Sequence, residues 1–111
     1  MSLLGPYYKQ PDEQETIEID LAARISSFVV ASYAIASVSV TVLDSVGADV
    51  TGTMLEGVPT YDGTSIFFTI KAGTTGNTYY AKAVTTCTKA GGYSDQLVEE
   101  DVEITVTEYG F

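Results

Sequence analysis

The 111-residue sequence contains no histidine, no tryptophan and only one cysteine. Histidine is the commonest general base and the commonest metal ligand in proteins. Its absence excludes Ser-His and Cys-His catalysis within this chain, and it also excludes zinc sites of the usual Cys/His type. The single cysteine, Cys87, rules out an internal disulfide. The length suits one domain that buries a modest core without a disulfide or a metal.

Basic residues are also scarce, since 5 lysines and arginines stand against 15 aspartates and glutamates, for a formal net charge of -10. Proteins that bind nucleic acid or anionic membrane surfaces need clustered cations against phosphates. We therefore expect neither partner, and we interpret the acidity as a source of solubility. The basic residues are scattered along the chain: Lys9, Arg24, Lys71, Lys82 and Lys89.

Long apolar runs and targeting signals are missing as well. The most apolar run, residues 28–43, is shorter than the ~20 residues of a transmembrane helix and contains several hydroxyl side chains. No basic segment followed by an apolar stretch marks a signal peptide. Residues 1–14 show no periodicity, and Pro6 and Pro11 discourage a regular element. We expect an extended N-terminal arm there, followed by one domain over residues 15–111.

What the sequence does contain is alternation of apolar and polar residues, the pattern of half-buried β-strands. Valine, isoleucine and threonine, which favour strands, are frequent in these segments. Turn formers separate the segments every ten or so residues, so we expect an all-β, immunoglobulin-like sandwich of about seven antiparallel strands. The alternating segments are residues 15–21, 36–42, 65–70, 79–88 and 97–107.

Three segments leave their structure open. DLAAR, residues 20–24, has the composition of a single helical turn with Asp20 as its cap. Residues 28–31 suit either a short strand or a loop against the core. Residues 44–64 are rich in glycine and other turn formers, with room for one or two short edge strands around Val50 and Met54.

The stretch GTTGNTYYAKAVTTCTKAGG, residues 73–92, combines glycines with the only cysteine. A reactive thiol needs a helix N-terminus, a base or clustered cations to lower its pKa, so Cys87 is interpreted as structural. A phosphate-binding loop needs a different glycine spacing and a following helix. Gly73 and Gly76 therefore indicate a turn between two strands.

Two acidic clusters invite comparison with the calcium sites of some β-sandwiches. No EF-hand pattern is present, and consecutive carboxylates on a strand point to opposite faces. We interpret both clusters as solvated surface and expect no metal and no cofactor. The clusters are Asp12, Glu13 and Glu15 near the start, and Glu99, Glu100 and Asp101 near the end.

Tyrosine is abundant, with 8 residues, and it is enriched at protein interfaces because it buries a large ring behind a polar tip. We expect Tyr7, Tyr8 and Tyr80 to contribute to an interface, together with Phe67, which the alternation places on the outer face of its strand. Tyr79, directly after a turn, has instead the position of a tyrosine corner.

The second half of the chain has a distinctive order: a strand, a glycine turn with a Gly-x-x-Tyr step, a strand ending in Thr-Thr, a second glycine turn and a final alternating strand. It reads SIFFTIKAGTTGNTYYAKAVTTCTKAGG and then VEITVTE, while the first half contains KQPDEQETIEIDL and IASVSVTV. Over residues 9–108 this pattern resembles small Ig-like structural proteins of tailed bacteriophages and prophages, in particular tail-fibre adaptor or neck-associated proteins.

The resemblance implies a non-enzymatic structural or assembly role in a virion, with the protein made in the bacterial cytoplasm. The implied partners are copies of this chain, as a homo-oligomer, or other phage structural proteins. It transfers no catalytic residues. An alternative is an Ig-like adhesion or carbohydrate-binding module of a bacterial surface protein, with or without calcium, although sugar platforms usually contain tryptophan. A small enzyme is the least favoured interpretation.

Overall fold

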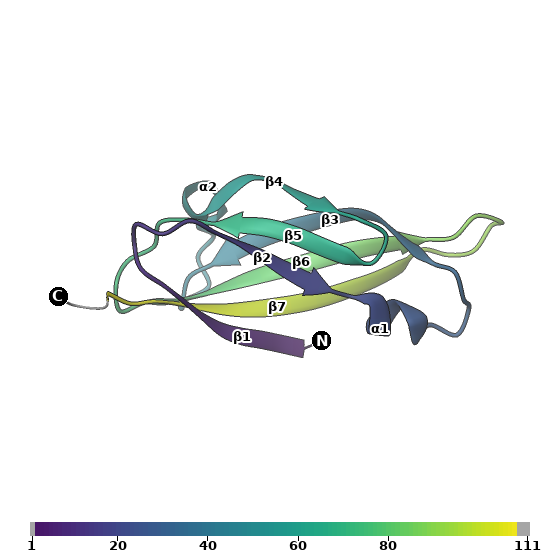
Figure 1. Ribbon diagram of the computed structural model, residues 1–111, viewed down its shortest axis with the longest axis horizontal. Helices are drawn as coiled ribbons and strands as arrows, with labels where there is room; N and C mark the ends of the chain where they lie inside the picture. Colours follow the sequence, from purple (N-terminus) through teal and green to yellow (C-terminus); the bar gives the residue numbers. More distant parts are fainter. Residues whose placement is uncertain (1, 109–111) are drawn as a thin grey trace.

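Two β-sheets pack face to face in an elongated domain of 56 × 23 × 22 Å (Figure 1). The structure is a computed structural model that describes residues 2–108, and it confirms the expectation of an all-β fold. The elements are β1 (Ser2–Lys9), β2 (Glu15–Asp20), α1 (Ala22–Ser26), β3 (Ala34–Leu43), α2 (Thr51–Met54), β4 (Leu55–Tyr61), β5 (Ser65–Ile70), β6 (Thr78–Thr88) and β7 (Gln96–Val106).

The larger sheet has the strand order β1-β7-β6-β3 and the smaller one the order β2-β5-β4. Neighbouring strands are antiparallel, with one exception: β1 runs parallel to β7. The expectation of antiparallel strands throughout was therefore wrong at this pair. The paired strands β1 and β7 are the first and the last of the domain. A hairpin therefore cannot join them, and they come together only through the folding of the strands between them.

The core is a single apolar layer between the sheets. Because the side chains of a strand alternate between its two faces, β2, β5 and β6 send every second residue into this layer, as does β7 from Val102 to Val106. Burying one valine or isoleucine side chain contributes about 1.5–3 kcal/mol. The predicted inward faces are buried: Ile17, Ile19, Ile66, Phe68, Ile70, Tyr79, Ala81, Ala83, Thr85, Cys87, Val102, Ile104 and Val106.

Strand β3 departs from the alternation predicted for it. Val40 and Val42 are buried as expected, but Ala36 is exposed and Ile35 is buried in its place. The pairing of β3 with β6 shifts register between Ile35 and Ser37. A bulge at this point changes which residues face the core. Odd-numbered residues are therefore buried before the bulge and even-numbered residues after it, although the sequence pattern itself continues without a break.

The N-terminal segment is part of the sheet, and the expectation that its prolines would prevent a regular element was wrong. Residues 2–9 form β1, and the pairing with β7 shifts register between Leu4 and Tyr7, where Gly5 and Pro6 stand. Proline is tolerated in edge strands and at bulges because its missing N–H is not needed there. Gly5 has φ +99°, and a Cβ at this position would lie 2.7 Å from the carbonyl oxygen of Glu103.

The end of β1 is held by an unusual interaction of a lysine. Lys9 is only 2% exposed, and its Nζ donates hydrogen bonds to the carbonyl oxygens of Gln10 at 2.7 Å and Ala72 at 2.5 Å. Burial lowers the pKa of the Lys9 ammonium, against the opposing effect of Glu13. The lysine thus ties the first strand to the connection between β5 and β6.

The open segments also have clear structures. DLAAR leads into α1 as expected, but Asp20 is not its cap, because Leu21 occupies the N-cap position and makes no side-chain cap bond. Asp20 stands one residue earlier, where its Oδ1 accepts a hydrogen bond from the Ala22 N–H at 2.9 Å. Residues 28–31 form a loop. The edge strand expected around Val50 and Met54 begins later, because α2 occupies Thr51–Met54 and β4 starts at Leu55.

Replacing Gly5 with alanine is expected to destabilise the domain. The positive φ costs about 1–3 kcal/mol for a residue with a side chain, and the added Cβ would push β1 away from β7. The free energy of unfolding should be measured by chemical denaturation. Gly52→Ala is the control, because Gly52 lies in α2 without a positive φ, and a Cβ added there would meet no atom within 4 Å. Equal stability of the two variants would contradict this account of β1.

Candidate functional site

One end of the sandwich carries Val29, the most exposed of the large apolar side chains in the described part of the chain, together with the half-exposed Tyr93. It is built by two connections, residues 27–33 between α1 and β3 and residues 89–95 between β6 and β7, which lie on the same side of Figure 1. We call these two segments the loop end. Residues 27–33 contain no charged residue, and residues 89–95 contain Lys89 and Asp95.

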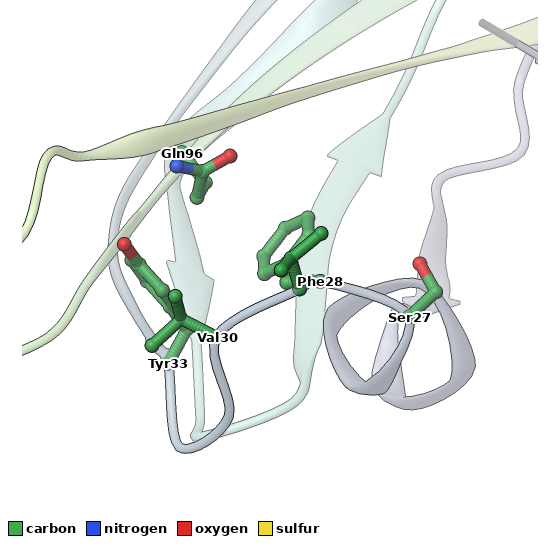
Figure 2. Close-up of a pocket in the computed structure, with 6 residues that line it drawn as sticks. Ser27, Phe28, Val30, Tyr33 and Gln96 are labelled. Atoms are coloured by element: carbon green, nitrogen blue, oxygen red, sulfur yellow. The ribbon is translucent and has the colours of Figure 1, made fainter.

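A pocket of about 360 Å³ opens at the loop end. Figure 2 shows Phe28, Val30, Tyr33 and Gln96 around it, with Ser27 at the end of α1. The rings of Phe28 and Tyr33 meet edge to face, with centroids 5.4 Å apart and planes at 81°. This geometry is favourable for aromatic pairs, so the pocket has one rigid apolar wall.

The two loops are tied together by the tyrosine of that pair. Tyr33 Oη donates a hydrogen bond to the carbonyl oxygen of Ser94 at 2.7 Å, which joins the end of one loop to the end of the other. Ser32 (φ 70°) and Gly91 (φ 104°) both have positive φ and let the chain turn sharply. The loop end is therefore organised before any partner arrives.

Cations and aromatic rings are paired on this surface. The Arg24 guanidinium lies 5.4 Å from the ring centroid of Phe28, and the Lys89 ammonium lies 5.4 Å from that of Tyr93. Each arrangement is within cation–π range. Val29 is fully exposed, and Tyr93 is about half exposed. The loop end, with Arg24 of α1 beside it, thus combines apolar, aromatic and basic groups.

A second pocket, of about 370 Å³, lies at the opposite end, between α2 and the connection from β5 to β6. Its wall includes Met54 and Tyr79, and the Tyr79 Oη accepts a hydrogen bond from the Thr74 N–H at 3.0 Å. Burial alone would raise the pKa of the Tyr79 phenol, but hydrogen bonds, first that of Thr74, bring it below its ordinary value. Gly73 leaves no room for a side chain, because a Cβ would lie 2.7 Å from Val106 Cγ2.

The four side chains predicted to form an interface do not gather in one place. Tyr8 lies opposite Thr105, so it is on the outer face of the larger sheet, as is Tyr80 on β6. Phe67 is half-buried on the outer face of the smaller sheet, on the other side of the sandwich. Tyr7 is 37% exposed at the β1 edge. Their role in an interface stays a prediction for each residue separately.

Sequence reasoning missed the loop end because its members come from segments far apart in the chain. The available signal was the uncharged run SFVVASY, residues 27–33, whose composition suits either a strand or a loop. This apolar run precedes β3 and lies outside the sheet, and apolar residues outside a strand can form exposed apolar surface. The two loops meet only in the folded chain, where Tyr33 Oη is hydrogen-bonded to the Ser94 carbonyl oxygen.

Cys87 and the glycine turn before its strand have the predicted placement. Cys87 is a free, fully buried thiol on the inner face of β6. Burial raises the pKa of this thiol, and the charge of Arg24 offsets only part of that effect, so the reactive thiolate is disfavoured. Gly73 and Gly76, with φ of +95° and +89°, form the turn between β5 and β6.

The acidic cluster on β7 is divided between the two faces of its strand. Asp101 lies opposite Lys82 on the outer face, and Lys82 Nζ is 3.4 Å from Glu99 Oε1. Asp101 Oδ1 is buried without a hydrogen-bond partner. Burial raises the pKa of Asp101, the neighbouring Glu99 adds to the rise, and Lys82 opposes it. Within residues 2–108, no group of three or more histidines, cysteines and carboxylates is placed to hold a metal ion.

Comparison with known proteins identifies no family for this chain. A scan against protein-family models finds none that matches the chain, and a search of curated proteins finds no significant relative. Across residues 2–108, every helix is too short or too polar to cross a membrane.

Replacing Asp101 with asparagine is expected to stabilise the protein at neutral pH. The pKa of Asp101 is raised on folding, so its ionised form costs stability once the pH exceeds the folded-state value, and costs nothing below the unfolded-state value. The gain, a few tenths to about 1 kcal/mol, should be present at about pH 7 and vanish near pH 3. Thermal unfolding at several pH values measures it.

The control for that experiment is Asp95→Asn, which removes the same formal charge from an exposed position at the loop end. A gain of equal size in both variants would assign the effect to net charge. A gain for Asp101→Asn that persists in acid would contradict the raised pKa.

Proposed function

We propose that this chain is an Ig-like β-sandwich that serves as a non-enzymatic structural protein of a phage or prophage particle. It acts through protein–protein contact, and the loop end is its principal contact surface. The observation that carries the proposal is the pair of loops joined by the Tyr33–Ser94 hydrogen bond, which exposes Val29 and Tyr93 and holds Arg24 and Lys89 against aromatic rings. The resemblance of residues 9–108 to Ig-like phage proteins supplies the setting.

The strand order supports the Ig-like assignment. In an Ig-like sandwich, one sheet contains strands B, E and D and the other contains C, F and G. The sheets β2-β5-β4 and β3-β6-β7 follow the same order. The first strand differs from the constant-type arrangement, because β1 adds to β7 rather than to β2.

Tyr79 supports the assignment independently. A tyrosine corner lies near the start of strand F and bonds through its hydroxyl to backbone a few residues upstream. Tyr79 is the second residue of β6, and its Oη accepts the hydrogen bond of the Thr74 N–H. Two residues further on, where antibody domains have a disulfide cysteine, this chain has the fully buried Ala81.

The chemistry of the loop end favours a protein partner. Aromatic residues and arginine are enriched in the buried centres of protein interfaces, and Phe28, Tyr93 and Arg24 supply such groups here. The loops at one end of variable-type Ig domains form a binding surface in the same way. A partner with an apolar contact surface and carboxylates near Arg24 and Lys89 would complement it, and another structural protein of the particle fits that description.

The proposal predicts that the chain is a component of purified particles and that Val29 is needed for its incorporation. Val29→Glu would place a carboxylate in a dry interface, which is costly without a partner. Its incorporation should fall at least tenfold, measured by quantitative mass spectrometry of gradient-purified particles. The matched control is Val46→Glu, because Val46 is also highly exposed but lies in the connection at the opposite end.

Three outcomes separate the parts of this proposal. Absence of the wild-type chain from particles would overturn the virion role. Normal incorporation of Val29→Glu would keep the virion role and overturn the loop end as the contact surface. An equal fall in the incorporation of Val29→Glu and Val46→Glu would also contradict a special role of the loop end. The melting temperature of each variant shows that it is folded.

A further inference from the structure

The two sheets have four edge strands, and three of them carry features that oppose pairing with another chain. Unpaired backbone groups at an edge are a template for further strands, and proteins block them with proline, charge or bulges. Edge β1 contains Pro6 at a register shift, β2 exposes Glu18, and β4 contains Pro59 within its own register shift. Edge β3, AIASVSVTVL, has no charge, proline or glycine.

Both ends of the β3 edge are covered by the protein itself. Near its start, Tyr61 Oη donates a hydrogen bond to the Ala36 carbonyl oxygen at 2.5 Å. Near its end, the Val42 N–H donates to Thr51 Oγ1 at 2.8 Å, and the Val42 carbonyl oxygen accepts from the Val50 N–H at 2.8 Å. The outward backbone groups of Ala36 and Val42 described above are therefore already hydrogen-bonded within the chain.

The middle of the β3 edge has backbone groups without a hydrogen-bond partner among the described residues, although β4 of the smaller sheet packs against β3. Backbone groups of a strand alternate between its two sides, and β3 pairs with β6 without a shift from Ser37 to Leu43. Val38 and Val40 therefore direct their N–H and C=O groups away from β6, as Val42 does. Among the described residues, none makes a hydrogen bond to these groups on that side. The centre of this open window is Ser39, whose side chain is exposed.

We propose that β3 pairs antiparallel with β3 of a second copy of this chain, about a twofold axis at Ser39. Val38 of each copy exchanges backbone hydrogen bonds with the partner's Val40, which makes four bonds in all. Ser39 faces the partner's Ser39, and Ser37 faces the partner's Thr41. The two larger sheets then form one continuous sheet, with the order β1-β7-β6-β3-β3-β6-β7-β1.

The sequence around Ser39 is complementary to itself. Residues 37–41 read Ser-Val-Ser-Val-Thr, so a hydroxyl faces a hydroxyl and a valine faces a valine when the strand is reversed. Cross-strand serine and threonine pairs are favourable. An isologous contact between two copies requires a self-complementary surface. Pairing with a strand of a different protein would not require the β3 sequence to be complementary to itself. A second copy is therefore the occupant that the edge fits.

The acidic charge of the chain does not oppose this contact. Strand β3 has no charged residue, and the outward carboxylates of the larger sheet are on β7, two strands away from the β3 edge. The Glu99 residues of two joined copies would be five strand spacings apart, about 24 Å. That separation exceeds the Debye length of about 8 Å at physiological ionic strength, so their repulsion is largely screened.

The proposal deepens the one above, since it supplies the self-association of the proposed virion protein through a surface other than the loop end. It predicts a monomer–dimer equilibrium of the purified chain. A four-bond edge contact belongs to the small, weak class of interfaces, so sedimentation equilibrium should extend to about 1 mM protein. Ser39→Lys places two ammonium groups opposite each other at the axis and should weaken dimerisation at least tenfold. Thr16→Lys adds the same charge at an exposed position of the blocked edge β2 and should leave dimerisation unchanged.

A cysteine at the axis tests the register. Directly opposed residues of a non-hydrogen-bonded antiparallel pair have Cα atoms about 4.5 Å apart, which suits a disulfide. Ser39→Cys should therefore form a covalent dimer under mild oxidation. Ser37→Cys should not, because the two introduced thiols would be four residues out of register, about 13 Å apart. Cys87 is fully buried and does not compete.

A wild-type chain that remains monomeric throughout this range would overturn the proposal, as would a dimer that Ser39→Lys leaves intact. Equal cross-linking of Ser37→Cys and Ser39→Cys would overturn the twofold register. Each failure is distinct from failure of the virion role, which the composition of purified particles decides. The β3–β3 dimer is supported if Ser39→Lys weakens dimerisation tenfold and if Ser39→Cys forms the cross-link while Ser37→Cys does not. Melting temperatures within about 3 °C of wild type, less than the shift expected for 1 kcal/mol in a domain of this size, show that the variants are folded.

Discussion

The strict alternation of buried and exposed side chains is the constraint on which this structure depends. Both sheets contribute to one apolar layer, and a slip of a single residue in any strand would move its whole apolar set to the water-facing side. The alternation therefore determines register, and register determines which strands become edges and where the connections meet. Both surfaces to which a role is proposed, the loop end and the β3 edge, are consequences of this one layer.

Alternation also decides how much of the fold the sequence predicts. Strands β2, β5 and β6 have an uninterrupted pattern and β7 has one from Val102 to Val106, and the inward faces of these segments follow from it residue by residue. The prediction failed at Ala36, because a bulge inserts one residue and reverses the faces without leaving a mark in the sequence. It failed again at β1, where Gly5 and Pro6 interrupt the pattern and the partner strand is almost the whole chain away. A local pattern holds no information about such a distant partner.

The candidate site was harder to predict than the fold. Individual tyrosines and Phe67 have the chemistry of interface residues, but chemistry alone does not say which side chains share a surface. The connections that contain Val29 and Tyr93 lie at the same end of the sandwich because α1 leads into one of them and β6 leads into the other (Figure 1). The β3 edge is different in kind. Its openness follows from which backbone groups are already bonded, and it becomes visible only when the hydrogen bonds of every edge are accounted for.

The parallel pairing of β1 with β7 has a mechanical consequence. The two strands run in the same direction, with Ser2 opposite Glu100 and Lys9 opposite Val106. A tension that pulls the chain apart on either side of the domain acts along these strands and in opposite senses, so it loads their hydrogen bonds in shear. Bonds loaded in shear share the force and must break together, whereas the bonds of an unzipping hairpin break one at a time. Resistance to such forced unfolding is governed by the unfolding rate, and the buried ammonium of Lys9 anchors the far end of the pair. Tension along these two strands would therefore load all the β1–β7 hydrogen bonds at once.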